Sequence, residues 1–104
     1  MLHTTYIVIS AEKSTASALE NIHRSTELET VLEDRGHAFR RARGSYRGIQ
    51  EASYLVPVTK YTEVNQLRDL AAEFGQESIL EIKQGHGWLL FTDGTEEYIG
   101  TTVS

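Results

Sequence analysis

The stretch of this sequence most suited to chemistry is GSYRGIQEAS, residues 44–53, in which Tyr46 stands near the carboxylate of Glu51. The acid enters a segment that then becomes apolar, YLVPV. An acid in such a place must be solvated, paired with a cation or used in binding. The two glycines of the stretch equally suit a hairpin connection that needs positive φ. The residues alone leave both interpretations open: a surface turn, or a pocket that handles a charged small molecule.

A second polar pair, Gln76-Glu77, falls between an expected helix and the apolar run SILEI. Loops at such junctions commonly carry binding residues. The pattern by itself favours a plain solvated turn. Gly85-His86-Gly87 also resembles a loop that approaches a ligand closely, but a tight turn before a strand is the simpler explanation.

Other kinds of site lack their signatures. The chain has no cysteine, so thiolate metal sites and disulfides are excluded. Its histidines show no pair at the spacing of a zinc-binding helix; they are His3, His23, His37 and His86. Neither a nucleophile elbow nor a phosphate-binding GxxxxGK[ST] loop is present. We therefore expect neither a metal nor a cofactor.

Composition describes an ordinary globular protein. With 104 residues, 39% hydrophobic and 24% charged, residues 1–104 are expected to form a single domain. The net charge of −5 argues against nucleic-acid binding. The arginine cluster of residues 35–47 lacks an aromatic stacking platform beside it. The longest apolar runs, such as YIVI, are too short to span a bilayer, and no secretory signal is visible. A cytoplasmic protein without membrane partners is the expectation.

The elements that must position the polar residues follow from periodicity. Residues 4–9 are rich in β-branched side chains and predict a strand. Residues 10–24 predict an irregular loop, followed by a helix capped at Thr26 and closed by Gly36. Residues 37–43 predict a second strand.

The second half continues the same alternation. Residues 54–58 predict a third strand, which Pro57 places at an edge or near its end. A helix capped by Thr62 and ended by Gly75 comes next. The strand of residues 78–82 and a hairpin around Asp93-Gly94 complete the chain. This order predicts an α+β sandwich of ferredoxin-like type, with an antiparallel sheet, two helices on one face and a C-terminal hairpin.

Taken together, these motifs resemble the phage enzymes that degrade S-adenosylmethionine (SAM), formerly called hydrolases and now regarded as lyases. YIVISAEKS is similar to the opening strand of that family, and Asn21 and Arg24 match polar positions before its first helix. GSYRGIQEAS is similar to its Gly- and Tyr-containing run. LRDLAAEFGQESILEI and GWLLFTDG resemble its second helix with the Gln-acid corner and its closing hairpin. The chain departs in a shorter connection after Glu51 and in having almost no C-terminal extension.

The resemblance implies a fold like that of the trimeric PII signalling proteins, with active sites between subunits of a homotrimer. It implies a lyase that cleaves SAM to 5′-methylthioadenosine and L-homoserine lactone, in the cytoplasm of an infected bacterial host, as an anti-restriction function. Glu51 and Tyr46 would then be catalytic, holding the substrate's ammonium and orienting its amino-acid part. The implied substrate-binding residues are Gln76, Glu77, Ser10 and Ser53.

Two alternatives stay open. A non-catalytic PII-like sensor that binds a nucleotide between subunits would use the arginine cluster for phosphates. A phage accessory protein that binds a host protein is the third interpretation. Sequence does not separate a lyase from a hydrolase, because the two differ only in whether water takes part.

Overall fold

A computed structural model describes residues 4–46 and 49–101, with only the course of the backbone for residues 44–46 and 49–51. The elements follow the order strand, helix, strand, strand, helix and three strands. Their bounds are β1 Thr5–Ile9, α1 Ala18–Asp34, β2 Arg40–Tyr46, β3 Ile49–Val58, α2 Tyr61–Glu73, β4 Ser78–Lys83, β5 His86–Phe91 and β6 Glu96–Thr101.

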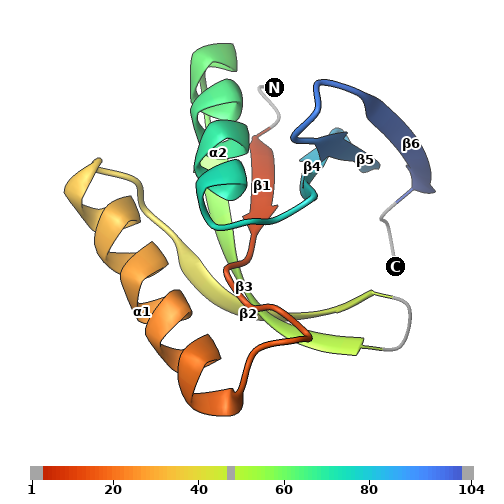
Figure 1. Ribbon diagram of the computed structural model, residues 1–104. Helices are drawn as coiled ribbons and strands as arrows, with labels where there is room; N and C mark the ends of the chain where they lie inside the picture. The colour runs from red at the N-terminus through yellow and green to blue at the C-terminus, as the bar shows by residue number, and fades with distance from the viewer. Residues whose placement is uncertain (1–3, 47–48, 102–104) are drawn as a thin grey trace.

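The strands form one sheet in the order β2-β3-β1-β4-β5-β6, and every neighbouring pair is antiparallel. The first four strands and the two helices reproduce the ferredoxin-like arrangement, in which β1 and β3 are central and each helix connects two strands across the sheet. The β5–β6 hairpin extends the sheet beyond β4 and curls round toward the α2 side (Figure 1). The predicted fold class is confirmed.

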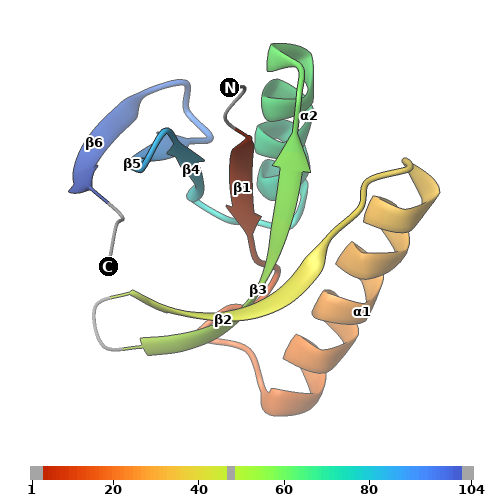
Figure 2. The same cartoon turned by 180° about the vertical axis from the view of Figure 1, so that it is seen from behind.

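Both helices pack on the same face of the sheet, as the view from behind also shows (Figure 2). Ile7 and Ile9 on β1 alternate with less buried neighbours, so one face of the strand supplies the core. Leu28 of α1 and Leu67 of α2 are almost fully buried against it. Each such side chain contributes about 1.5–3 kcal/mol when it leaves water. This single core holds both helices against the sheet.

Each helix ends in a Schellman motif, with a left-handed glycine just beyond it. After α2, Gly75 has φ +72° and the N–H of Gln76 donates to the carbonyl of Ala71 at 2.9 Å. After α1, Gly36 has φ +79° and His37 donates to Leu32 in the same way. Both predicted helix ends, at Gly36 and Gly75, are therefore confirmed. The turn at Gly75 sets the position of Gln76.

Four predicted starts were wrong. Strand β3 begins at Ile49 rather than at Tyr54, because residues 49–53 already pair with β2. Helix α1 begins at Ala18 rather than after Thr26, because Ser17 caps it by accepting from the N–H of Glu20 at 3.1 Å. Helix α2 begins after Lys60 instead of Thr62; the carboxylate of Glu63 accepts from the Lys60 N–H at 3.0 Å. Strand β2 begins at Arg40 and leaves His37 outside, because the α1 end motif already uses the His37 N–H.

The turn chemistry was predicted correctly. Gly94 has φ +97°, and the Asp93 carboxylate accepts from the Thr95 N–H at 2.9 Å at the tip of the last hairpin. Pro57 is the second-last residue of β3. The pairing with β2 ends two residues earlier, at Leu55 opposite Arg40. Its missing N–H is thus tolerated where one side of the strand is open. Within the part of the chain that the structure describes, no helix is long and apolar enough to cross a membrane.

Candidate functional site

The loop between β1 and α1 organises the polar end of the sheet. Strand β1 pairs with β3 only as far as Ile9 opposite Tyr54. Beyond that point, the Ser10 hydroxyl donates to the carbonyl of Ala52 at 2.8 Å, and the Glu12 carboxylate accepts from the N–H of Ala52 at 3.2 Å. Side chains of the loop therefore continue the ladder where the strand has ended, because buried backbone groups need partners. This fixes the backbone beside Glu51.

The corner after α2 reaches the same loop. The side-chain amide of Gln76 donates to the backbone carbonyl of Glu12 at 2.9 Å. Thr92 holds the other side of the corner, since its N–H donates to the carbonyl of Glu77 at 2.9 Å and its hydroxyl lies 3.3 Å from the carbonyl of Gln76. The corner is consequently tied to both β5 and the β1–α1 loop.

Two cations lie at the C-terminal end of α2, whose own last turn has no basic residue. Arg24 donates from Nε to the carbonyl of Ala11 at 2.6 Å and from Nη2 to the carbonyl of Phe74. A Cβ atom added to Gly75 would lie 2.6 Å from Nζ of Lys13. Positive charge at this end complements the helix dipole by about 0.3–1 kcal/mol for each group. Glycine leaves the space that the lysine needs.

Some of the site residues predicted from the sequence contact the β1–α1 loop, and others do not. Ser10 and Gln76 come together through Glu12. Ser53 is buried on β3, and its neighbour Tyr54 points to the opposite, helix-covered face. Glu77 is exposed.

The two residues predicted to be catalytic are known by their backbone alone. Glu51 is the third residue of β3 and pairs with Gly44, while Tyr46 ends β2 opposite Ile49. Their side chains lie outside the described residues. Residues 44–53 therefore belong largely to the paired strands β2 and β3. Glu51 is next to Ala52, whose backbone is hydrogen-bonded to the side chains of Ser10 and Glu12.

The arginines of β2 lie beside this region on an edge strand. Arg41 makes a bidentate ion pair with Glu29 of α1, with distances of 2.7 and 2.9 Å, and Glu29 also accepts from the hydroxyl of Tyr54 at 2.7 Å. The hydrogen bond from Arg41, then that from Tyr54, lowers the pKa of Glu29. Burial, and next the Glu29 carboxylate, raises the pKa of Tyr54 to about 12. This group holds α1 on the sheet, while Arg40 and Arg43 are exposed.

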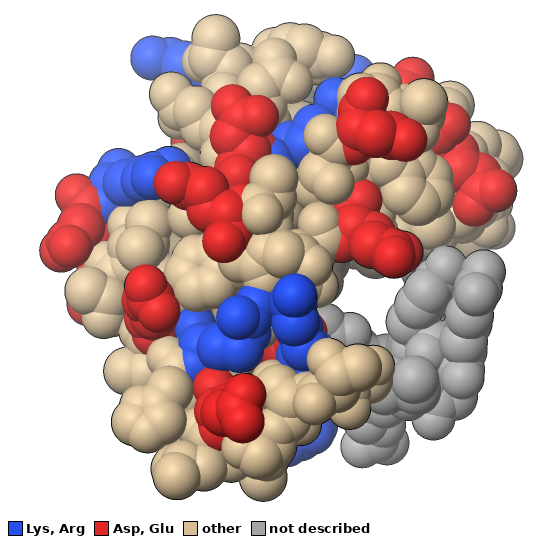
Figure 3. Space-filling model, viewed as in Figure 1, with Lys and Arg blue, Asp and Glu red and all other residues tan. Residues whose placement is uncertain are grey.

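Charge on the helix-bearing side is unevenly spread (Figure 3). Several basic side chains form a group near the middle of this view with acidic side chains close to it, and other basic side chains lie toward the top and left. Among the residues whose positions are described, no three His, Asp or Glu side chains cluster closely enough to hold a metal ion.

Sequence reasoning missed Glu12 and Thr92, which carry the contacts that assemble the site. Glu12 lies in a segment that predicts only an irregular loop, and its partners are 40 and 64 positions away. Thr92 reads as the end of a strand. In the sequence, only the family resemblance points to Arg24 and to the Ala11-Glu12-Lys13 segment as part of a site.

The arrangement suits holding a molecule more than transferring protons to it. The Ser10 hydroxyl already donates to Ala52 and accepts from the N–H of Glu12 at 3.1 Å. No histidine of the described chain takes part in these contacts. The side-chain carbonyl of Gln76 and the carboxylate of Glu77 make no hydrogen bond to another described residue, and are available as acceptors.

Comparison with known proteins agrees with the resemblance. Residues 7–104 match the model of a family described as the S-adenosylmethionine lyase family. The match covers nearly the whole chain, including the loop, the β3 segment and the α2–β4 corner. A search of curated proteins found no match.

Proposed function

Because the chain belongs to the S-adenosylmethionine lyase family, we propose that it cleaves SAM to 5′-methylthioadenosine and L-homoserine lactone. The observation that supports a site at this end of the sheet is the convergence on Glu12. Through it, Ser10, the β3 backbone next to Glu51 and the Gln76 corner are held together. Hydrogen bonds thus join three segments of the chain at this polar end of the sheet.

The proposed reaction needs no acid or base from the protein. A carboxylate oxygen of the substrate attacks its own γ-carbon, the carbon–sulfur bond breaks, and the electron pair stays on sulfur. The sulfonium leaves as a neutral thioether, and the lactone keeps the ammonium charge, so charge and atoms balance without a proton transfer. Positioning of a tethered nucleophile can contribute about 7–11 kcal/mol to such a step.

In this proposal the site residues share the work of folding the substrate. Glu51 pairs with the substrate's ammonium, and Tyr46 orients the amino-acid part or lies against the sulfonium. The free acceptors of Gln76 and Glu77 receive hydrogen bonds from the adenine or ribose. Ser10 acts as a positioning residue, since both hydrogen-bonding directions of its hydroxyl are already used by the protein. Ser53 lines the substrate site from β3.

We propose further that the site is completed in a homotrimer. The sheet face without helices carries a set of half-buried or buried apolar side chains: Tyr6, Val8, Leu55, Leu80, Ile82, Leu89 and Phe91. A face of this kind gains free energy when covered, and another copy of the same sheet is the natural cover. Neighbouring subunits would then border the site at Glu51.

The direct experiment incubates the purified protein with SAM and measures 5′-methylthioadenosine by chromatography. We expect product from the wild type and none from Glu51→Gln, with Glu27→Gln on the exposed face of α1 as the matched control. Near-normal turnover by the Glu51 variant would disprove the assignment. In heavy-oxygen water, an unlabelled lactone as first product identifies the lyase, whereas homoserine labelled at its γ-hydroxyl identifies a hydrolase; later opening of the lactone labels only the carboxylate.

A non-catalytic nucleotide sensor is the second candidate, and the exposed Arg40 and Arg43 on β2 favour it. It predicts nucleotide binding without any loss of SAM.

The lyase proposal also includes a phage anti-restriction role in the cytoplasm of an infected bacterium. Expression of the wild type, but not of Glu51→Gln, should then lower the cellular SAM pool; an unchanged pool would contradict that role.

A further inference from the structure

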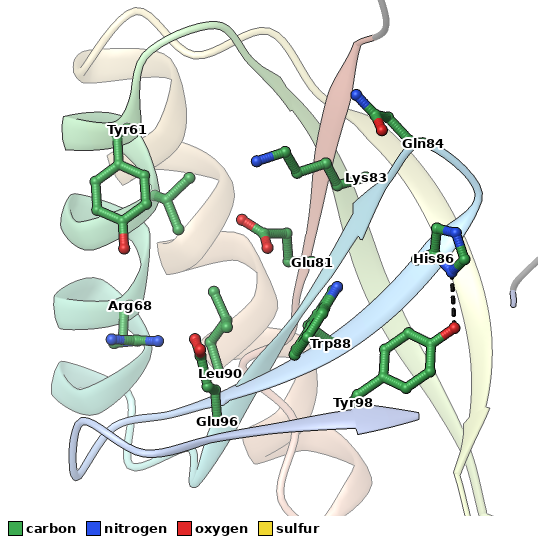
Figure 4. Close-up of a pocket in the computed structure, with 11 residues that line it drawn as sticks. Tyr61, Arg68, Glu81, Lys83, Gln84, His86, Trp88, Leu90, Glu96 and Tyr98 are labelled. Carbon is green, nitrogen blue, oxygen red and sulfur yellow. Dashed lines mark hydrogen bonds between the residues drawn. The ribbon is translucent and has the colours of Figure 1, made fainter. Parts of the chain in front are cut away.

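A pocket of about 680 Å³ lies between α2 and the inner face of the β4–β5–β6 part of the sheet (Figure 4). Its volume is within the range of about 300–1,000 Å³ common for small-molecule sites. It shares no residue with the proposed lyase site, whose predicted members lie on β1, β2, β3 and the α2–β4 corner. Nothing in the proposed reaction uses it.

One wall of the pocket is aromatic. The rings of Trp88 and Tyr98 lie on neighbouring strands with their centres 4.9 Å apart and their planes at 56°. The Tyr98 hydroxyl and Nδ1 of His86 are joined by a hydrogen bond of 2.7 Å. This bond holds the tyrosine ring beside the indole, so the wall is preformed and offers a flat surface for stacking.

The rest of the pocket is lined by charges of both signs, and none of them forms an ion pair with a described residue, although Arg68, after the hydrogen bonds from Thr95, is close enough to Asp93 to help lower the pKa of that carboxyl. Arg68 projects from α2 into the pocket, and its Nε is buried without a hydrogen-bond partner among the described residues. Glu81, Lys83 and Glu96 also line the pocket and form neither an ion pair nor a side-chain hydrogen bond with any described residue. A buried donor without an acceptor is costly, by about 1–3 kcal/mol. The Nε of Arg68 therefore has no acceptor among the described residues, and neither carboxylate of the pocket has a hydrogen-bonded cationic partner there.

We propose that this pocket binds a small zwitterionic amino acid with a flat ring. Its carboxylate pairs with Arg68, its ammonium pairs with Glu96 or Glu81, and its ring stacks on Trp88. Two fixed cations and two fixed anions balance, so a ligand without net charge loses the least on entering. A ligand with only a carboxylate or only an ammonium leaves either the anions or the cations of the pocket without a partner.

The pocket contains its own reporter, because Trp88 is the single tryptophan of the chain. The test titrates the full-length protein with L-phenylalanine and follows tryptophan fluorescence. We expect a saturable change. Phenethylamine lacks the carboxylate and 3-phenylpropanoate lacks the ammonium, so each should bind about tenfold more weakly or worse, the effect of losing about 1.4 kcal/mol.

Variants assign the effect to the pocket. Arg68→Gln and Glu96→Gln should each weaken L-phenylalanine binding about tenfold, whereas Arg35→Gln, on an exposed pair at the end of α1, should leave it unchanged. Glu96 is exposed, so its variant tests the proposal even if Arg68→Gln fails to fold. Glu51→Gln should bind normally, which separates this site from the lyase proposal. The proposal is wrong if no saturable change occurs, if phenethylamine binds equally well, if both pocket variants bind normally, or if Glu51→Gln abolishes binding.

Discussion

The side-chain amide of Gln76 donates a 2.9 Å hydrogen bond to the backbone carbonyl of Glu12, a residue 64 positions earlier in the chain. The bond joins the corner after α2 to the loop after β1. Glu12 in turn accepts from the N–H of Ala52, so the corner is linked to the β3 backbone beside Glu51. The position of the corner therefore determines the shape of the proposed site.

Gln76→Ala should damage function more than stability. Loss of one part-buried hydrogen bond costs about 1 kcal/mol of unfolding free energy. Release of the corner should lower kcat/KM for SAM at least about tenfold, an effect of about 1.4 kcal/mol on the transition state. Steady-state kinetics and urea unfolding measure the two effects. Gln66→Ala, at an exposed position of α2, is the control and should change neither.

Gly75→Ala and Gly36→Ala form a matched pair, because both glycines follow a helix with nearly equal positive φ, +72° and +79°. Each substitution should cost about 1–2 kcal/mol of unfolding free energy through left-handed strain. Only at Gly75 would the new Cβ collide with Lys13, whose flexible end can move away; no atom lies within 4 Å at Gly36. Lyase activity should thus fall only in Gly75→Ala. Equal activities in the two variants would show that the position of Lys13 is irrelevant.

Stability at acidic pH should depend on Glu29. Its pKa is lowered from the usual 4.5 by the hydrogen bonds from Arg41 and Tyr54. A lowered pKa in the fold adds stability that is fully present above the unfolded value and is lost as pH falls through the folded value. Glu29→Gln should therefore melt below the wild type at neutral pH, and the gap should close as the pH falls from 4.5 through the lowered folded value.

Thermal unfolding measured across pH tests this expectation. Glu27→Gln, on the exposed part of the same helix, should follow the wild-type curve. At the alkaline end, the pKa of Tyr54, raised to about 12, predicts a second loss of stability as pH rises from about 10 toward that value. A gap between wild type and Glu29→Gln that stays constant from acid to neutral pH would contradict the role of the ion pair.

Leu80→Asp should dissociate the proposed trimer. Leu80 lies on the helix-free face of β4, where a charge would be buried between subunits at a large cost. Sedimentation velocity should show the wild type at three chains and the variant at one, with lyase activity lost. Leu19→Asp is the matched control, since Leu19 is 64% exposed on α1. A monomeric wild type, or a trimeric Leu80→Asp, would refute the assembly.

Much of the fold was predictable because its signals are local. The strand of residues 78–82, the periodic apolar positions of α2 and the Asp93-Gly94 turn each specify their own structure. The start of α1 was missed because its first turns face water: Leu19 and Ile22 are both more than half exposed. The capping pair Ser17 and Glu20 was the available signal.

The candidate site was less predictable because its contacts are long-range. Gln76 stood out at a junction, but nothing local indicates that Glu12 would be its partner. The strand β2 is rich in arginine and owes its conformation to pairing with β3 rather than to its own preference. Such positions become visible only once the order of the sheet is known.

The bonds made by Glu12 also bear on the kinetics of folding. Like the pairings of β1 with β3 and β4, they close long loops, here of 40 and 64 residues, whereas the β2–β3, β4–β5 and β5–β6 hairpins and both helices close far shorter ones. Contacts of high sequence separation form late, after local structure has reduced the entropy of closure. Refolding chains should accordingly regain their helices and hairpins before they regain any turnover, because the proposed site needs the long-range contacts of Glu12 and β1.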